Sequence, residues 1–171
     1  MEKFDVTKNM DFSNDFTGTA GVFSVAGHFA NGATVEVVDG TEYLGAFTVA
    51  SGQVDVSAIK PTSVAAQIGY KYTPEIRTLP FDAQVQGGPL TGEPRKITKV
   101  VLDLYETLSV SVNGTALQLR TVTHSIGSGN TPVTGKQEFR VLGYSRDPRV
   151  TITQEAPLPL QINGMITEVS F

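Results

Sequence analysis

The sequence predicts an all-β fold, either an antiparallel sandwich or a barrel, and three observations lead to it. Threonine and valine are frequent and there are 17 glycines, whereas alanine-, lysine- and glutamate-rich helical tracts are missing. Short segments alternate apolar and polar residues, which is the period of a half-buried strand. Turn signals recur between these segments, so the pattern indicates roughly ten short strands and no convincing helix.

The chain has 171 residues, enough for one domain or for two small β subdomains. The best internal boundary is 86–94, where three glycines and two prolines stand within nine residues. The sequence therefore predicts a first β subdomain at 1–85, a Gly/Pro-rich connection at 86–94 and a second β subdomain at 95–171.

In the first half, β-branched and alternating segments are punctuated by turn dipeptides. Asp39-Gly40 closes one strand and Ser51-Gly52 turns the chain into another. Two prolines bracket a short extended piece before the Gly/Pro-rich connection. The segments expected to be extended here are 34–38, 43–49, 53–56, 64–70 and 75–79.

In the second half, the segment 96–106 satisfies both helical and strand spacing. Its β-branched pairs favour a strand. Asn-Gly dipeptides at 113–114 and 163–164 each predict a two-residue turn between strands. The remaining predicted strands are 109–112, 117–119, 139–142, 150–153, 161–162 and 165–169.

Charge is unevenly distributed. The first 60 residues carry eight acidic and three basic side chains, a balance of −5, and the rest of the chain is close to neutral. Nucleic-acid binders show a concentrated positive footprint, so no sequence-specific nucleic-acid binding is expected, although DNA could pass such an acidic surface without being held. No apolar run is long enough to span a bilayer. We therefore expect a soluble protein without a membrane partner.

Residue types that carry chemistry are few. The two histidines, His28 and His124, are far apart in sequence and belong to no metal-ligand or triad spacing, and there is no cysteine. A Gly-Ser-Gly-Asn run at 127–130 lacks the lysine of a phosphate loop and is interpreted as a hairpin tip. Asp11 and Asp15 lack the glycine and distal glutamate of a calcium loop. The sequence predicts no catalytic residue, no metal site and no cofactor.

Aromatic and basic side chains offer candidates for an interaction surface. At strand spacing, most aromatic residues are core or cross-strand partners, and a binding face is the alternative reading. The residues proposed for an assembly interface are Tyr70, Tyr72, Tyr144, Arg146 and Arg149.

Several stretches, in one order, resemble the C-terminal region of a known protein family. The stretches are VAGH at 25–28 with GATVEVVDG at 32–40, IGYKYTP at 68–74 with TLP at 78–80, RKI at 95–97 with LDLYETL at 102–108, and TGK at 134–136 with RVTITQEAPLPL at 149–160 and EV at 168–169. They are similar to segments of the tail tubular, or nozzle, proteins of short-tailed, podovirus-type bacteriophages. Members of that family are usually several times longer, with a large β-rich portion ahead of this region.

The resemblance implies a structural component of the virion, made in the bacterial host cytoplasm. Such a protein assembles with copies of itself in a ring around the DNA exit channel, contacts other tail proteins and takes part in genome ejection. The family has no catalytic residues to transfer to this chain. The alternative is a carbohydrate- or receptor-binding β-sandwich of a viral or surface adhesin, and a hydrolase on a sandwich scaffold is a third hypothesis.

Overall fold

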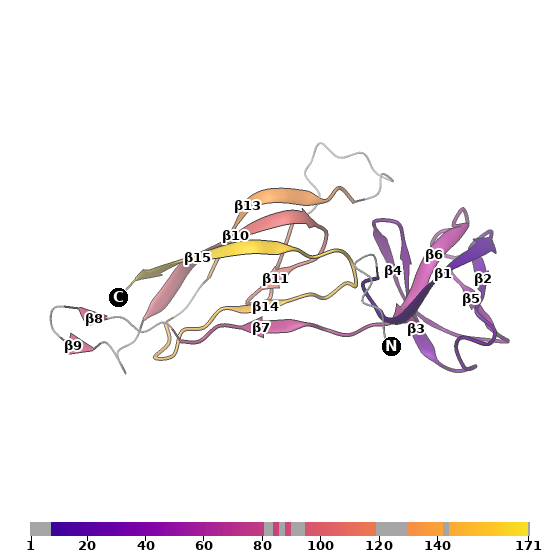
Figure 1. The fold of residues 1–171 in the computed structure, drawn as a ribbon, viewed down its shortest axis with the longest axis horizontal. Coiled ribbons are helices and arrows are strands. Elements are labelled where there is room, and N and C mark those ends of the chain that lie inside the picture. The colour runs from indigo at the N-terminus through magenta and orange to yellow at the C-terminus, as the bar shows by residue number, and fades with distance from the viewer. Residues whose placement is uncertain are drawn as a thin grey trace. The chain divides into compact units, whose positions relative to one another are not determined.

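A computed structural model describes residues 8–80, 84–85, 88–89, 95–118, 130–141 and 144–170 (Figure 1). All regular structure in these residues is β-strand, arranged in antiparallel sheets, which confirms the predicted fold class. The described segments contain no helix that could cross a membrane.

The chain divides into two compact units. Unit 1 comprises Met1–Thr73, Val122–Thr131 and Ala156–Pro159, and unit 2 comprises Pro74–Thr121, Pro132–Glu155 and Leu160–Phe171. Strand β7 (Glu75–Arg77) precedes the predicted connection at 86–94 but belongs to unit 2, because it pairs with β14 (Thr151–Thr153) of that unit. Most of 86–94 lies outside the described residues, and only the short hairpin of β8 (Gln84–Val85) and β9 (Gly88–Pro89) is described near it.

Unit 1 is a six-stranded sheet that curls on itself. The strand order is β4-β3-β6-β1-β2-β5. The two end strands are consecutive in sequence and joined by a tight turn, in which Ala50 and Gln53 exchange two backbone hydrogen bonds of 2.9 Å. The sheet is therefore bent until its first and last strands meet at that turn. Its strands are β1 (Asp11–Thr19), β2 (Val22–Ser24), β3 (Thr34–Asp39), β4 (Glu42–Thr48), β5 (Gln53–Asp55) and β6 (Ala65–Tyr70).

The core of unit 1 follows the alternation of its strands. Inward-facing side chains such as Phe23, Val35 and Ile68 are fully buried in one apolar cluster. Strands β1 and β2 were not expected from the sequence. Only Phe16 of the nine β1 residues is buried, so β1 carries no apolar alternation and is held instead by its pairing with β6 and β2.

A charged network ties the β3–β4 hairpin to the loop before β6. The Lys60 ammonium lies 3.1 Å from both Asp39 and Glu42, and the Ser63 hydroxyl donates to the Asp39 carboxylate at 2.6 Å. Partial burial opposes the charged form of Lys60, but hydrogen bonds to both carboxylates outweigh it and raise the pKa of Lys60 above 10.5. The network therefore stabilises unit 1 with a charged lysine.

Replacing this lysine tests the network. We expect Lys60→Met to lower the free energy of unfolding by about 1 kcal/mol at pH 7, since the pair is half-exposed. The folded-state pKa is raised, so the contribution of Lys60 is fully present below 10.5 and is lost as the pH rises through the folded value. Urea unfolding of both proteins at several pH values from neutral upward should show a difference that shrinks only at high pH. A difference that disappears near neutrality would contradict this account.

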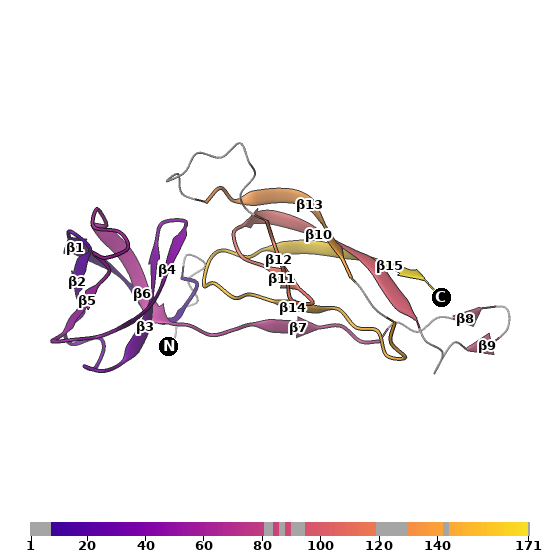
Figure 2. The ribbon, with the colours of Figure 1, turned by 180° about the vertical axis from the view of Figure 1, so that it is seen from behind.

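Unit 2 is a sandwich of two sheets. The β13-β10-β15 sheet faces the β12-β11-β14-β7 sheet, as Figures 1 and 2 show from opposite sides. Their inner faces share one apolar cluster that includes Leu102, Val112, Phe139 and Ile152. The strands are β7 (Glu75–Arg77), β8 (Gln84–Val85), β9 (Gly88–Pro89), β10 (Lys96–Thr107), β11 (Ser111–Val112), β12 (Thr115–Ala116), β13 (Val133–Arg140), β14 (Thr151–Thr153) and β15 (Ile162–Ser170).

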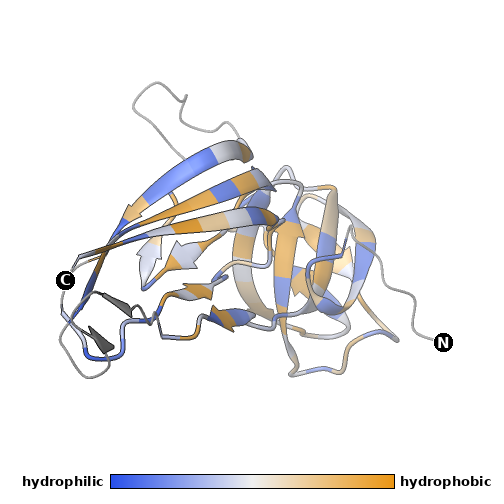
Figure 3. Ribbon diagram, turned by 60° about the vertical axis from the view of Figure 1, so that its left-hand side comes forward, coloured by the Kyte–Doolittle hydropathy of each residue, from blue (hydrophilic) through white to orange (hydrophobic). Residues whose placement is uncertain are grey.

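The long strand β10 confirms the strand interpretation of 96–106 and corrects another prediction. It pairs antiparallel with β13 on one side and β15 on the other. The turn predicted at Asn163-Gly164 is wrong, because β15 runs through it without a break. Asp103 pairs with Gly164 and Leu104 with Ile162, so Asn163 is the extra residue of a β-bulge. Figure 3 shows hydrophobic and hydrophilic residues alternating along the strands.

Candidate functional site

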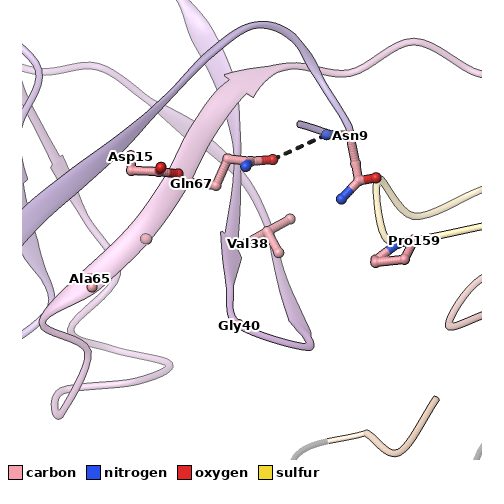
Figure 4. A pocket seen from close by; sticks show the side chains of 8 residues that line it. Asn9, Asp15, Val38, Gly40, Ala65, Gln67 and Pro159 are labelled. Atoms are coloured by element: carbon pink, nitrogen blue, oxygen red, sulfur yellow. Dashed lines mark hydrogen bonds between the residues drawn. The ribbon is translucent and has the colours of Figure 1, made fainter. Parts of the chain in front are cut away.

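A shallow pocket of about 430 Å³ lies in unit 1 (Figure 4). Its polar groups are few: the Asn9 backbone N–H donates to the Gln67 side-chain oxygen at 3.3 Å, and the one carboxylate, Asp15, is paired with Lys8 at 2.5 Å. The rest of the lining is Val38, Gly40, Ala65, Ala66 and Pro159. The single carboxylate already has a cation, so this pocket assembles no pair of groups for acid–base chemistry.

The histidines and acidic residues that the sequence offers as candidate sites do not come together in the described structure. His28 is exposed, with its Nδ1 3.3 Å from the Asn14 amide and its ring against Phe16. The Asp11 carboxylate accepts the Phe12 backbone N–H at 3.0 Å. His124 and residues 127–129 of the Gly-Ser-Gly-Asn run lie outside the described residues. Where side chains are described, no group of three or more His, Cys, Asp or Glu could hold a metal ion.

An exposed aromatic patch marks the start of β1. The Phe12 ring stacks on Tyr70, with centroids 6.4 Å apart, and both rings pack edge-on against buried Phe29 at 5.8 and 5.4 Å. Phe12 is 59% exposed and Tyr70 38% exposed, so one buried ring supports two rings at the surface. We call Phe12 and Tyr70 the aromatic patch of unit 1.

The backbone puts Phe12 at this position. The β1–β6 register shifts between Asp11 and Asn14, and Phe12 has a φ of 48°. The bulge presses Ser13 against Gly69 of β6: a Cβ on that glycine would lie 2.6 Å from the Ser13 Cβ. Gly69 therefore makes room for the bulge that exposes Phe12.

Unit 2 has a second hollow, of about 290 Å³, beside Tyr144 and Arg149. The Arg149 guanidinium donates from Nε and Nη2 to one Asp147 carboxylate oxygen, at 3.1 and 2.7 Å. The Tyr144 ring is 67% exposed, and the Lys96 ammonium lies 5.7 Å from its centroid. This hollow combines an aromatic face with paired charges and the Asn113 amide.

The predicted interface residues thus fall into two groups. Tyr70 and Tyr72 are exposed in unit 1, and Tyr144, Arg146 and Arg149 lie in one segment of unit 2. That segment is anchored by the backbone of buried Arg95, which exchanges two 2.8 Å hydrogen bonds with Ser145. Their role in an interface stays a prediction.

The outer face of the β13-β10-β15 sheet carries a charged row that sequence reasoning missed. Lys99 of β10 lies opposite Arg140 of β13 and Glu168 of β15. Its ammonium is 3.3 Å from Glu168 and 3.7 Å from Glu138. The hydrogen bond to Glu168, followed by the charge of Glu138, raises the pKa of Lys99. These side chains meet only through strand pairing, so no local pattern in the sequence could have joined them.

The two outer strands of this sheet differ in their side chains. Strand β15 exposes Ile166 at 61% and Met165 at 39%, and its charged residue is Glu168. Strand β13 alternates the charged residues Lys136, Glu138 and Arg140 on its exposed face. One edge of the sheet is therefore largely apolar and acidic, and the other is predominantly basic.

In comparisons with known proteins, the chain matches no protein-family model and no curated protein.

The close approach at Gly69 can be tested by substitution. Gly69→Ala forces the new methyl group against the β1 bulge, and we expect a loss of about 1–3 kcal/mol in the free energy of unfolding. Gly164→Ala is the matched control, because an added Cβ there meets nothing within 4 Å and the glycine also lies in a strand. Urea denaturation should show the first variant destabilised and the second unchanged or slightly stabilised. Equal effects would refute the role assigned to Gly69.

Proposed function

We propose that this chain is a structural module of a bacteriophage tail, acting in the tube or nozzle around the DNA exit channel during genome ejection. One observation carries the proposal. Several exposed large apolar side chains sit on sheet edges or at a bulge: Ile76 on β7, Ile166 on β15 and Phe12 on β1. Such exposure is typical of surfaces that contact other chains rather than of a converging reactive pocket.

The resemblance noted in the sequence supports the same proposal. The resembling segments include β3 with its following turn, the residues on either side of β7, most of β10, and β14, so they are spread over both units. In the proposed role, the partners are copies of this chain and other tail proteins. The acidic side chains of the first 60 residues would repel phosphate, which would let DNA slide past without being held.

Purified particles provide the direct test. Mass spectrometry of virions from the phage that encodes this chain should detect it as a stoichiometric component. Antibody labelling should place it at the tail by electron microscopy. Its absence from intact particles would overturn the proposal, and labelling of the head alone would contradict the assignment to the tail.

The alternative function, a carbohydrate- or receptor-binding module, is favoured by the hollow in unit 2. The exposed Tyr144 ring beside Asp147, Arg149 and Asn113 combines a stacking surface with hydrogen-bonding groups, which is the usual composition of a sugar site.

A glycan array separates the two functions. If the chain is a tail assembly module, we expect no glycan signal that depends on Tyr144. If it is a sugar-binding module, Tyr144→Ala should abolish binding while leaving the free energy of unfolding within about 0.5 kcal/mol of the wild type, because the ring is largely exposed. The control is Tyr72→Ala, which removes an exposed tyrosine of unit 1, away from the hollow in unit 2.

A further inference from the structure

We propose that copies of this chain associate edge to edge, with strand β15 of one copy pairing in parallel with strand β13 of the next. The inference deepens the proposed function, and it rests on that function for the expectation of a closed ring. It names the two surfaces through which self-assembly occurs, both of them in unit 2.

The first support is the strand topology. Strands β13 and β15 are the two ends of a three-stranded sheet, and neither has a second partner among the described strands. Each pairs antiparallel with β10, so the two edge strands run in the same direction. Rotation of a copy about an axis along the strands preserves that direction. The sheet can therefore continue from β15 of one copy to β13 of the next by parallel pairing.

The second support is that β15, apart from the bulge at Asn163, lacks the usual protection of an edge strand. Its nine residues, INGMITEVS, include no proline and no lysine. Glu168 is its one charged residue, and Ile166 is 61% exposed. Soluble proteins commonly block such an edge with lysine, proline or a covering segment, because its free N–H and C=O groups recruit further strands. The composition of β15 fits a strand that is covered in an assembly.

The third support is charge complementarity between the two edges. The row across the sheet reads Arg140, Lys99, Glu168. The Arg140 side chain is 88% exposed at one end, and the Glu168 side chain is 62% exposed at the other. A copy added in the same register places its Arg140 beside Glu168, which continues the row with opposite charges in contact.

In a two-fold arrangement, β15 of one copy would pair antiparallel with β15 of another. This leaves more strand edges and charged side chains without a partner than the head-to-tail arrangement does. Centred on Ile166, it sets Glu168 opposite Gly164 and leaves Arg140 without a new partner. It also leaves both β13 edges open. The head-to-tail arrangement uses both edges and both charges, and it closes by rotation.

Charge reversal tests the pairing on the full chain. Glu168→Arg and Arg140→Glu each place like charges at the interface, and each should weaken self-association about fivefold or more. The double variant restores the opposite charges and should recover association. An equimolar mixture of the two single variants should also associate, because in an alternating assembly each junction joins either two substituted edges or two unsubstituted edges, and both combinations bring opposite charges together. Sedimentation velocity and native mass spectrometry over a concentration series measure all five samples.

Two controls separate the interface from general effects. Glu155→Arg reverses the charge of an exposed acidic residue that lies in unit 2 but outside its strands. This variant should leave association unchanged. Ile166→Lys should weaken association, whereas Ile59→Lys, at a similarly exposed isoleucine of unit 1, should not. Thermal unfolding of each variant checks that it is folded.

The possible results distinguish the head-to-tail pairing from the two-fold arrangement and from the absence of either. Loss of association in both single variants, with recovery in the double variant and in the mixture, supports the proposal. If Ile166→Lys weakens association and neither charge reversal does, the two-fold arrangement replaces it. A wild type that stays monomeric throughout, or association that ignores both substitutions, overturns the pairing. Detection of the chain in virions is measured separately, so failure of the pairing and failure of the proposed function are distinguishable.

Discussion

Backbone hydrogen bonding is the constraint on which the rest of the described structure depends. Without helices, each strand must satisfy its N–H and C=O groups through neighbouring strands, and the strands that end a sheet keep one unpaired edge. The two units meet this constraint differently. Unit 1 bends its sheet until β4 and β5 meet at the Ala50–Gln53 turn, whereas unit 2 keeps two open sheets that end in β13, β15, β12 and β7.

This difference shapes what each unit can contribute to function. In unit 1, the surface feature is the aromatic patch, which exists because Gly69 gives room to a bulge at the start of β1. In unit 2, the surface features are strand edges and the hollow beside Tyr144. Both are features of backbone geometry that present side chains outward, and for this reason we propose a role in assembly.

The two Asn-Gly dipeptides show how much local sequence can decide. At 113–114 the dipeptide makes the predicted turn, with φ values of 47° and 79°, between the short strands β11 and β12. At 163–164 the same dipeptide lies inside β15, where Asn163 becomes the extra residue of a bulge. The neighbouring segments are long enough to pair with β10 on both sides of the dipeptide, and that pairing overrides the local turn preference.

The sequence by itself determined the β class, the strand at 96–106 and the turns at 39–40 and 113–114, because residue type and alternation act locally. It also identified exposed tyrosines such as Tyr70 and Tyr144 as surface candidates. Only the tertiary structure decided that the polar segment β1 is a strand, that Phe12 reaches the surface, and that Arg140, Lys99 and Glu168 form one row. Those features arise from register between segments distant in sequence, and no local pattern encodes register of that kind.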